Sequence, residues 1–318
     1  MKKYKGNKIV SSIKEEALYL NIGKVLIALS GGADSIATAH ALKEVGLEII
    51  ALHCNFHLRG DESDRDCRFV EEFCRVNDIQ LKLKDFNVDE YMQSHPGESI
   101  EMACRKLRYD WFDKILKETG YQRIVTGHNA DDNIETFLLN MLRGSGTRGL
   151  RGMSGDNGKI WRPLLKFHRE EIITYLKDNN LSYVVDSTNL LSDYRRNFLR
   201  NEIIPQLKKE WKGFNTSMDK TISNLENENR LVEDIINKNL KEAARSLSGE
   251  QILSFPAPLL LIKRYIEPLG PFVTTPEEVM SSIKANKPHI KKWRLKKGNL
   301  ILRNGCLFIE MGHSESST

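Results

Sequence analysis

The sequence is poor in cysteine, has no long apolar run and lacks the common phosphate-binding fingerprints. Its five cysteines are irregularly spaced and form no C-x-x-C pair, which argues against a disulfide framework and predicts reduced thiols. No apolar run reaches membrane-spanning length, and the basic N-terminal segment lacks the apolar core of a secretion signal. We therefore expect a cytoplasmic protein that does not associate with membranes.

The 318 residues are enough for two domains. Up to about residue 200, apolar strand patterns alternate with helical ones, which predicts an α/β fold with a doubly wound, mainly parallel sheet. Such a sheet places the loops that follow its strands along one edge. Strands are predicted at 24–29, 47–53, 79–84 and 123–127, and helices at 35–45, 62–77, 99–119, 131–142 and 168–179.

The character of the chain changes beyond residue 205. The polar stretch 214–247 predicts a long helix, and Thr275-Pro276 begins a short one. Alternating residues around 297–299 and 304–305 then predict small β-hairpins. We place the boundary near 210–215, giving a larger α/β domain at 1–212 and a smaller helical and β-hairpin region at 213–318.

The stretch Ser30-Gly31-Gly32-Ala33-Asp34-Ser35 follows a strand that is apolar throughout and leads directly into a helix. Its glycines allow a sharp turn and close approach to a ligand, and the first amides of the helix favour a phosphate. Neither G-x-x-x-x-G-K-[ST] nor G-x-G-x-x-G occurs here. Because Asp34 would repel a phosphate unless a cation lay between them, the loop predicts Mg²⁺–nucleotide chemistry.

Polar side chains also follow two other predicted strands. Arg59 comes after the second strand and is a candidate phosphate contact, whereas His53 and His57 are either ligand contacts or satisfied loop histidines. Asp132 follows the fourth strand, and two carboxylates from adjacent strand ends are what Mg²⁺ needs if it also holds phosphates. Its neighbour Asp131 fits equally well as a partner of the helix dipole.

Basic residues gather in four further segments. On the helix at 99–119, Arg108 shares a stripe with a possible surface ion pair, Glu101–Arg105, and is placed to reach the cleft. The other segments are a glycine-rich loop, a helical i, i+4 pair and a C-terminal hairpin, each of which suits RNA phosphates but also fits a solvated basic face. Their residues are Arg143, Arg148 and Arg151; Arg196 and Arg200; and Lys296 and Lys297.

Taken together, these segments resemble a known family. Residues 30–35 resemble the SGGxDS loop of the N-type ATP pyrophosphatases, the PP-loop proteins with an adenine nucleotide α-hydrolase-like fold. The later segments HCNFHLR, GHNADDNIET, RGSG-x-x-GL, RPL, D-x-T-N and RRN-x-x-R follow in the order seen in tRNA(Ile)-lysidine synthases. The E-x-A-x-R-x-x-R-Y segment from Glu101 to Tyr109 belongs to the same series. The resemblance runs from about residue 22 to 208.

The resemblance implies an ATP- and Mg²⁺-dependent ligase that acts on the CAU anticodon of bacterial tRNA(Ile). ATP would adenylate the C2 oxygen of the wobble cytidine, and the side-chain amine of free lysine would then displace AMP to form lysidine. His128 or a carboxylate would accept the amine proton.

With the residue patterns, the resemblance gives a complete set of expected site residues. For ATP these are Ser30, Gly31, Gly32, Ala33, Asp34, Ser35, His57 and Arg59; for Mg²⁺, Asp34 and Asp132; for catalysis, Asp34, Arg108, His128 and Asp132. The RNA-binding set is Arg143, Arg148, Arg151, Arg196, Arg200, Lys296 and Lys297.

Three other functions fit part of these observations. A PP-loop enzyme of the 2-thiocytidine type would need clustered cysteines, which the sequence lacks. A small-molecule amidotransferase or synthetase would need a glutaminase partner, and a non-catalytic RNA-binding relative would not need its carboxylates. The oligomeric state, including a homodimer, and the lysine pocket are left open by the sequence.

Overall fold

A computed structural model describes residues 7–184, 194–243, 251–254, 262, 276–284, 290–295, 298–303 and 306–311. The chain divides into two compact units, Met1–Glu226 and Asn227–Thr318, each considered by itself. The division falls within α11 (Phe214–Ala243), the long helix expected over 214–247. The domain boundary expected at 212/213 stays a prediction and coincides with the start of this helix.

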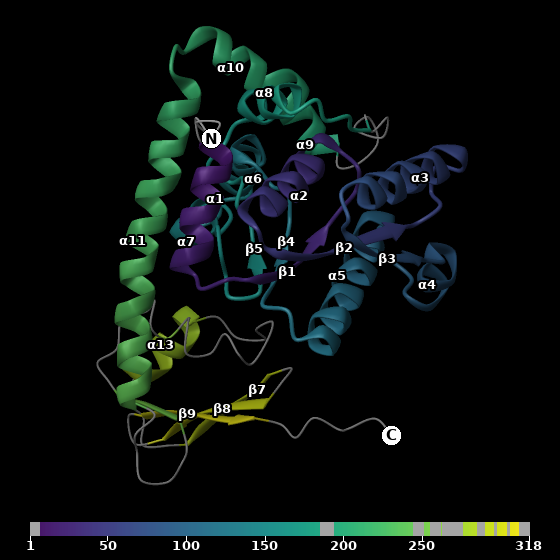
Figure 1. The fold of residues 1–318 in the computed structure, drawn as a ribbon. Coiled ribbons are helices and arrows are strands. Elements are labelled where there is room, and N and C mark those ends of the chain that lie inside the picture. Colours follow the sequence, from purple (N-terminus) through teal and green to yellow (C-terminus); the bar gives the residue numbers. More distant parts are fainter. Residues whose placement is uncertain are drawn as a thin grey trace. The chain divides into compact units, whose positions relative to one another are not determined.

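The first unit is built on a five-stranded parallel sheet with the order β3-β2-β1-β4-β5 (Figure 1). Four of these strands were predicted. The fifth was missed because it is only two residues long, too short for a periodic pattern. The strands are β1 (Lys24–Ala28), β2 (Glu48–Asn55), β3 (Gln80–Asp85), β4 (Arg123–Val125) and β5 (Ile160–Trp161).

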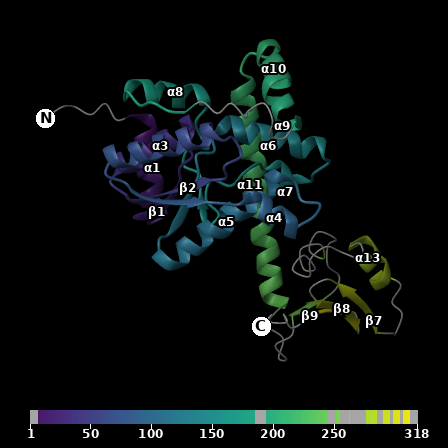
Figure 2. The ribbon, with the colours of Figure 1, turned by 90° about the vertical axis from the view of Figure 1, so that its right-hand side faces the viewer.

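Helices cover both faces of this sheet, as the apolar central strand β1 requires. Alternate residues of β1 point to opposite faces: Val25 and Ile27 pack in one core with α1, α2, α3 and α8, whereas Leu26 packs with α5. Figure 2 shows α8 and α5 on opposite sides of the strands. These helices are α1 (Lys8–Tyr19), α2 (Ala33–Val45), α3 (Asp61–Val76), α5 (Ile100–Thr119) and α8 (Arg169–Asp178).

Shorter helices complete the first unit. The segment at 131–142 is helical as predicted, whereas α1 and α4 were not expected. The missed α1 has apolar positions at Ile9, Ile13 and Ala17, all buried, and is capped by the Asn7 side chain. The remaining helices are α4 (Val88–Ser94), α6 (Ala130–Leu142), α7 (Thr147–Leu150), α9 (Tyr194–Phe198), the π-helical turn Leu199–Ile203 and α10 (Ile204–Glu210).

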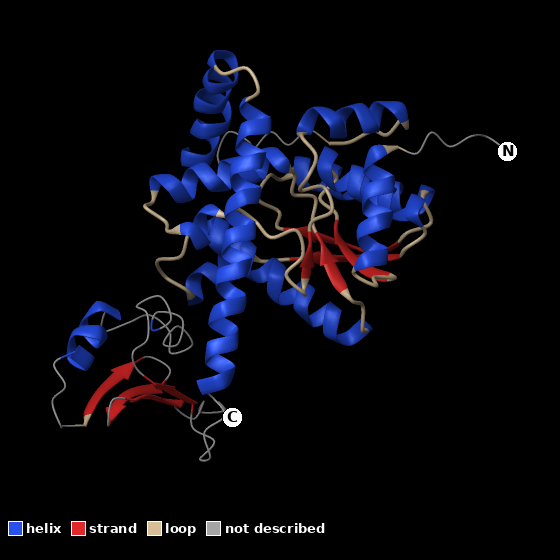
Figure 3. Ribbon diagram, turned by 90° about the vertical axis from the view of Figure 1, so that its left-hand side faces the viewer, coloured by secondary structure: helices blue, strands red, loops and turns tan. Residues whose placement is uncertain are grey.

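The second unit contains a small antiparallel sheet with the order β6-β9-β8-β7, drawn in red like the larger sheet in Figure 3. Its strands are β6 (Gln251–Ser254), β7 (Lys291–Leu295), β8 (Gly298–Arg303) and β9 (Cys306–Met311), and its helix is α13 (Pro276–Lys284). The pairing of β7 with β8 and of β8 with β9 confirms the predicted hairpins, whereas β6 was not expected. Among the described residues, no helix is both long and apolar enough to span a bilayer.

Candidate active site

The loop between β1 and α2 has the geometry of an anion cradle. Gly31 has a φ of 89°, a conformation in which a side chain would be strained, and its carbonyl accepts a 2.9 Å hydrogen bond from the amide of Val184. The Ser35 hydroxyl donates to the carbonyl of Gly32 at 2.9 Å and lies 3.2 Å from the Ser30 hydroxyl. The loop is thus fixed with the first-turn amides of α2 available to a phosphate.

A cavity of about 810 Å³ opens beside this loop at the carboxyl ends of β1, β2 and β4. This is the edge at which doubly wound sheets bind ligands, and the volume suits a nucleotide-sized molecule. The cavity brings together residues that lie up to a hundred positions apart in the sequence. Its polar lining includes Ser30, Gly32, Asp34, Ser35, His53, Asn55, Arg59, Glu101, Arg105, Arg108, Tyr109 and His128.

The charged stripe on α5 faces the cavity, where only Arg108 was predicted. Glu101, Arg105 and Arg108 all line it. The guanidinium of Arg108 lies 5.4 Å from the centre of the Phe56 ring, and that of Arg105 lies 5.1 Å from the Tyr109 ring. Cation–π contacts of this kind orient the two guanidinium groups while leaving their N–H donors available to a ligand.

His57 was expected to contact ATP, but it does not belong to the described cavity lining. Its Nε2 lies 2.7 Å from Asp85 Oδ1, and its side chain is half exposed. His53 lines the cavity instead, with Nδ1 2.8 Å from the carbonyl oxygen of Leu29. Burial lowers the pKa of His53, so its ring is neutral and Nδ1 donates this bond. The assignment of His57 to ATP gains no support from this placement.

Arg59 reaches the cavity from the β2–α3 connection. Its guanidinium donates a 2.9 Å hydrogen bond to Asp66 Oδ2, and the Asp66 side chain is only 6% exposed. The buried carboxylate orients Arg59 at the rim of the cavity. This position is compatible with the predicted phosphate contact.

One carboxylate oxygen of Asp34 is buried and makes no hydrogen bond to the described residues. Its Oδ2 pairs with the guanidinium of Arg169, whereas Oδ1 has no hydrogen-bond partner in the described part of the chain. Burial raises the pKa of Asp34, and the nearby Asp132 carboxylate raises it further, while Arg169 and, less strongly, the Asn129 side chain lower it. An unpaired carboxylate oxygen beside a second carboxylate favours the arrival of a cation.

Asp132 has two structural partners that the sequence did not reveal. Its Oδ2 accepts a 3.1 Å bond from the amide of Asn129 in a capping box at the start of α6. Its Oδ1 accepts a 3.0 Å bond from Arg200. A carboxylate offers about four lone-pair positions, so both contacts leave room for a further ligand.

The carboxylates of Asp34 and Asp132 suit an Mg²⁺ ion that also binds the phosphates of the substrate. Among the described residues, no group of three or more His, Cys, Asp or Glu side chains is arranged to hold a metal. Mg²⁺ commonly takes one or two carboxylates and fills its remaining positions with water and substrate phosphates. The unpaired Oδ1 of Asp34 next to Asp132 matches that pattern.

Arg196 in α9 and Arg200 in the π-helical turn meet at one buried acidic side chain, a partner that the sequence around them does not reveal. Arg200 donates to both oxygens of Glu135, at 2.6 and 2.9 Å, and Nε of Arg196 lies 3.6 Å from the same carboxylate. Glu135 is only 3% exposed and comes from α6, more than 60 residues earlier. Their RNA-binding role stays a prediction.

Among the other predicted RNA contacts, the three arginines of the glycine-rich loop do not belong to the described cavity lining. Arg143 and Arg151 are the C-terminal caps of α6 and α7, so the glycine-rich loop forms a short helix instead of an extended loop. Arg148 lies in the same helix and is exposed. Lys296 and Lys297 lie outside the described residues.

His128 is a neutral side chain in the cavity wall. Its Nδ1 lies 2.8 Å from the hydroxyl of Thr126. Burial lowers the pKa of His128 to about 4; the Asp132 carboxylate opposes this shift, whereas the positive charges of Arg162, Arg105 and Arg196 add to it. The imidazole is therefore uncharged at neutral pH, with one of its two ring nitrogens unprotonated.

Two residues of the site were not predicted. A Cβ atom on Gly127 would lie 2.9 Å from the backbone carbon of Asp34 and 3.0 Å from the amide nitrogen of Ser35, so only glycine lets the β4–α6 loop approach the phosphate loop this closely. Arg169, the first residue of α8, pairs with Asp34. A glycine at the end of a predicted strand, as in Thr126-Gly127-His128, is a sequence pattern that could have indicated Gly127. No local sequence pattern indicates Arg169.

His168 joins three elements beside the site. Its Nδ1 lies 3.3 Å from Asp131 in α6, and its Nε2 lies 2.8 Å from Asp219 in α11. The hydrogen bond to Asp131 and the contact with Asp219 raise the pKa of His168 to about 9, although burial opposes them. Burial alone would raise the pKa of Asp131, but His168, the Arg169 amide and Lys208 hold it below its usual range.

This arrangement predicts a stability contribution that depends on pH. Because the folded-state pKa of His168 exceeds its unfolded value of about 6.5, the contribution is complete below pH 6.5 and is lost as pH rises through about 9. Replacing His168 with Gln should therefore lower the free energy of unfolding by roughly 1–3 kcal/mol at pH 6 and by little at pH 9.5. Urea unfolding of both proteins at the two pH values measures this difference; an equal loss at both would contradict the assigned charge.

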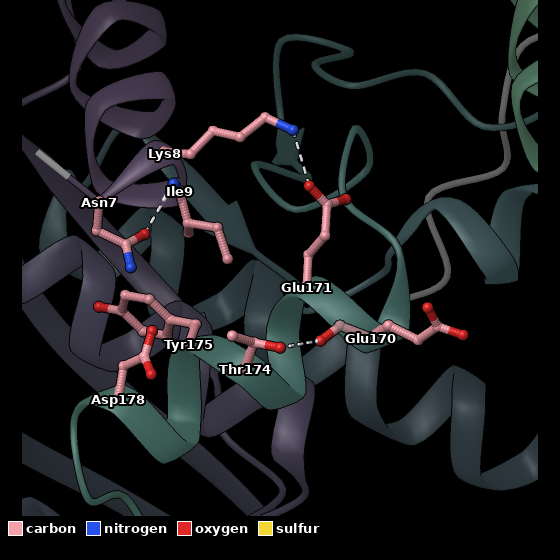
Figure 4. A pocket seen from close by; sticks show the side chains of 8 residues that line it. All are labelled: Asn7, Lys8, Ile9, Glu170, Glu171, Thr174, Tyr175 and Asp178. Carbon is pink, nitrogen blue, oxygen red and sulfur yellow. Dashed lines mark hydrogen bonds and ion pairs between the residues drawn. The ribbon is translucent and has the colours of Figure 1, made fainter.

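A second cavity of about 300 Å³ lies between the start of α1 and α8 (Figure 4). Several of its polar groups are satisfied locally: Lys8 pairs with Glu171 at 2.7 Å, and Thr174 donates to the carbonyl of Glu170 at 2.9 Å. We therefore regard it as a surface depression between packed helices. Its lining is Asn7, Lys8, Ile9, Glu170, Glu171, Thr174, Tyr175 and Asp178.

Comparison with known proteins agrees with this geometry. A profile of the PP-loop domain family matches residues 5–207. The tRNA(Ile)-lysidine synthase of Bacteroides thetaiotaomicron is 40% identical over 305 residues, which cover 93% of this chain and 70% of that protein. The enzyme of the same name from Porphyromonas gingivalis strain W83 is 41% identical over 270 residues, covering 83% of this chain and 59% of the relative.

A solved structure supports the fold class. The U34-tRNA thiolase NcsA from Methanococcus maripaludis, determined with its [4Fe-4S] cluster, aligns with a TM-score of 0.57 at 21% identity. The alignment covers 69% of this chain and 79% of that one, which confirms the predicted α/β fold. Because the PP-loop profile spans the whole cavity and relatives at about 40% identity share most of the chain, this protein belongs to the tRNA(Ile)-lysidine synthase family of PP-loop proteins.

Proposed function

We propose that the chain uses ATP to join lysine to C2 of the wobble cytidine in the CAU anticodon of tRNA(Ile), releasing AMP and pyrophosphate. The observation that carries this proposal is the cavity in which the phosphate loop, Asp34, Arg108 and His128 meet, in a chain of this family. Because the chain spans 59% to 70% of the length of the two relatives, the activity of the whole relatives is carried over here as a proposal. A cytoplasmic location follows from the same proposal, since its tRNA and ATP are found there.

The first step is adenylation of the tRNA. The C2 oxygen of the cytidine attacks the α-phosphorus, an O–P bond forms, and the bond to the β-phosphate oxygen breaks to release pyrophosphate. Amides at the start of α2 and the guanidinium of Arg108 stabilise charge that develops on the phosphates. Mg²⁺, held by Asp34 and Asp132, would neutralise phosphate charge when bound.

The second step replaces AMP with lysine. The side-chain amine attacks C2, a C–N bond forms, and the C2–O bond to AMP breaks. The amine must also lose a proton. His128 is neutral and lies in the cavity wall, so it is one candidate acceptor, and the neighbouring carboxylate of Asp132 is the other.

The order of these steps gives the test of the proposal. With bacterial tRNA and Mg-ATP but no lysine, adenylated tRNA should accumulate, because the groups assigned to the first step act on phosphate and not on the amine. Adding labelled lysine should then convert it to lysidine, detected by nucleoside mass spectrometry. Pyrophosphate release that strictly requires lysine would indicate adenylation of lysine instead.

The basic residues outside the cavity are proposed to hold the tRNA. Residues 290–304 contain no acid, but the fold gives Lys292 of the hairpin sheet a partner from β9, Glu310, at 3.1 Å. Lys291 instead donates to the Ser282 hydroxyl at 2.7 Å. Both side chains are exposed at the surface, so phosphates have access to them. The sequence places Lys296 and Lys297 in the same basic segment.

Replacing Lys296 and Lys297 together with Ala should weaken tRNA binding and reduce its dependence on log salt by roughly one to two units. The KM for ATP should barely change, because these residues are proposed to position RNA and not to act on phosphate transfer. The measurement is tRNA binding across a salt series, with Lys114→Ala/Lys117→Ala on α5 as the charge-matched control. An unchanged slope would exclude these two lysines as phosphate contacts.

The thiolation alternative gains no support from the described residues. Cys54 and Cys104 line the cavity, but burial raises the pKa of Cys54 to about 12 and also raises that of Cys104. Both are thus neutral thiols at physiological pH, unlike the thiolates that hold a cluster or carry persulfide. The shared fold with the thiolase is therefore not evidence for its chemistry.

A further inference from the structure

The two carboxylates assigned to Mg²⁺ are each paired with an arginine. Arg200 pairs with Asp132, and Arg169 pairs with Asp34. The two arginines differ in how firmly they are held. Arg200 also makes two hydrogen bonds to the buried Glu135, whereas the described contacts of the Arg169 guanidinium are with Asp34 alone.

Arg169 combines a fixed backbone with a movable side chain. Its amide donates a 2.8 Å hydrogen bond to Asp131 Oδ2. The preceding His168 is itself held between Asp131 and Asp219. The Arg169 side chain is 46% exposed, whereas that of Asp34 is 25% exposed, so the guanidinium can move without disturbing the start of α8.

A guanidinium and a divalent cation on the same carboxylate repel each other. When Mg-ATP enters, the metal competes for Asp34, and the triphosphate brings negative charge to the amides of α2 beside it. Guanidinium groups bind phosphate oxygens with strong, charge-assisted hydrogen bonds. The phosphates can therefore bind the Arg169 guanidinium when the metal displaces it from Asp34.

We propose that Arg169 fills the cation position beside Asp34 in the nucleotide-free protein and transfers to the nucleotide phosphates when Mg-ATP binds. This rests on the proposed function, which assigns Mg-ATP to the cavity. Arg169 thereby neutralises one of two repelling carboxylates in the empty site and becomes a catalytic residue in the loaded one. Binding of free metal is disfavoured until the nucleotide arrives with it.

The first test measures metal binding without nucleotide. Mn²⁺ binding followed by electron paramagnetic resonance should be tighter in Arg169→Gln than in wild type, by on the order of tenfold, because the competing charge-assisted bond is gone. Lys166→Gln removes the same charge from an exposed pair with Glu16, 2.9 Å long, and should leave Mn²⁺ affinity unchanged. Adding Asp34→Asn to Arg169→Gln should abolish the gain. Equal affinities in wild type and Arg169→Gln would overturn the cation position.

The second test follows the nucleotide. Arg169→Gln should raise the KM for Mg-ATP in tRNA-dependent pyrophosphate release by on the order of tenfold, and Arg169→Lys should restore part of the loss. A wild-type KM and rate in Arg169→Gln would overturn transfer to the phosphates. If the wild-type protein releases no pyrophosphate, the proposed function fails, whereas the Mn²⁺ comparison still tests the cation position.

Discussion

Asp34→Asn should lower the rate of tRNA-dependent pyrophosphate release by on the order of 10² or more while leaving the fold intact, which is the scale of losing one preorganised electrostatic contact. Asn keeps the shape of the side chain but removes the charge that holds a divalent cation. The unpaired Oδ1 of Asp34 suggests that this carboxylate serves a ligand more than the fold. Loss of its ion pair with the half-exposed Arg169 should cost little stability.

Asp132→Asn should show the same loss of rate together with a loss of stability. Asp132 closes the capping box of α6 and accepts a bond from Arg200, and weakening a helix cap typically costs about 1 kcal/mol. Comparing the two variants thus separates metal binding from folding at one site. Pyrophosphate release and thermal unfolding are the measurements, with Asp110→Asn, an exposed carboxylate of α5, as the control. A near-normal rate in either variant would refute its assignment to the metal.

The sheet and the phosphate loop could be predicted because their causes are local. Strands buried on both faces are continuous apolar runs, and a glycine-rich turn between a strand and a helix is typical of a phosphate site. The stripe of Glu101, Arg105 and Arg108 follows from helical periodicity alone, and all three residues face the cavity. Periodicity gives no signal for β5, which is only two residues long, whereas the missed helix α1 does carry buried apolar residues at helical spacing.

Pairing between distant segments could not be predicted in this way. Glu135 lies 65 residues before Arg200, and Asp34 lies 135 residues before Arg169. The sequence around each arginine therefore does not reveal the acid that the fold places beside it. The same limit applies to His53 and His57, which lie close together near the end of one predicted strand. Tertiary contacts alone show that His53 lines the cavity and that His57 pairs with Asp85.

Gly127 is constrained by a contact between distant segments, because its backbone packs directly against that of the phosphate loop. It lies between Thr126 and His128, both of which line the cavity. Each of the three atoms nearest to its missing side chain belongs to the backbone of Asp34 or Ser35, at 2.9 to 3.0 Å. Backbone cannot rotate away as a side chain can, so a methyl group must push the two loops apart.

Gly127→Ala should therefore reduce kcat/KM for ATP by on the order of 10², since a displacement of about 1 Å between reacting groups can cost that much. Forcing one methyl group into a packed contact should also lower the free energy of unfolding by about 1–3 kcal/mol. Steady-state pyrophosphate release and urea unfolding measure the two effects separately. The loss of rate should persist at temperatures where the variant is fully folded, because the cause is the displaced phosphate loop and not unfolding.

Gly155→Ala is the matched control for this substitution. It adds the same methyl group to the same unit, and a Cβ atom at Gly155 would meet no atom within 4 Å. Its rate and stability should stay close to those of the wild type. If Gly127→Ala behaves like Gly155→Ala, the close approach of the β4–α6 loop to Asp34 does not organise the site. If only Gly127→Ala loses activity, the distance between these two loops sets the geometry in which the nucleotide, Asp34 and His128 meet.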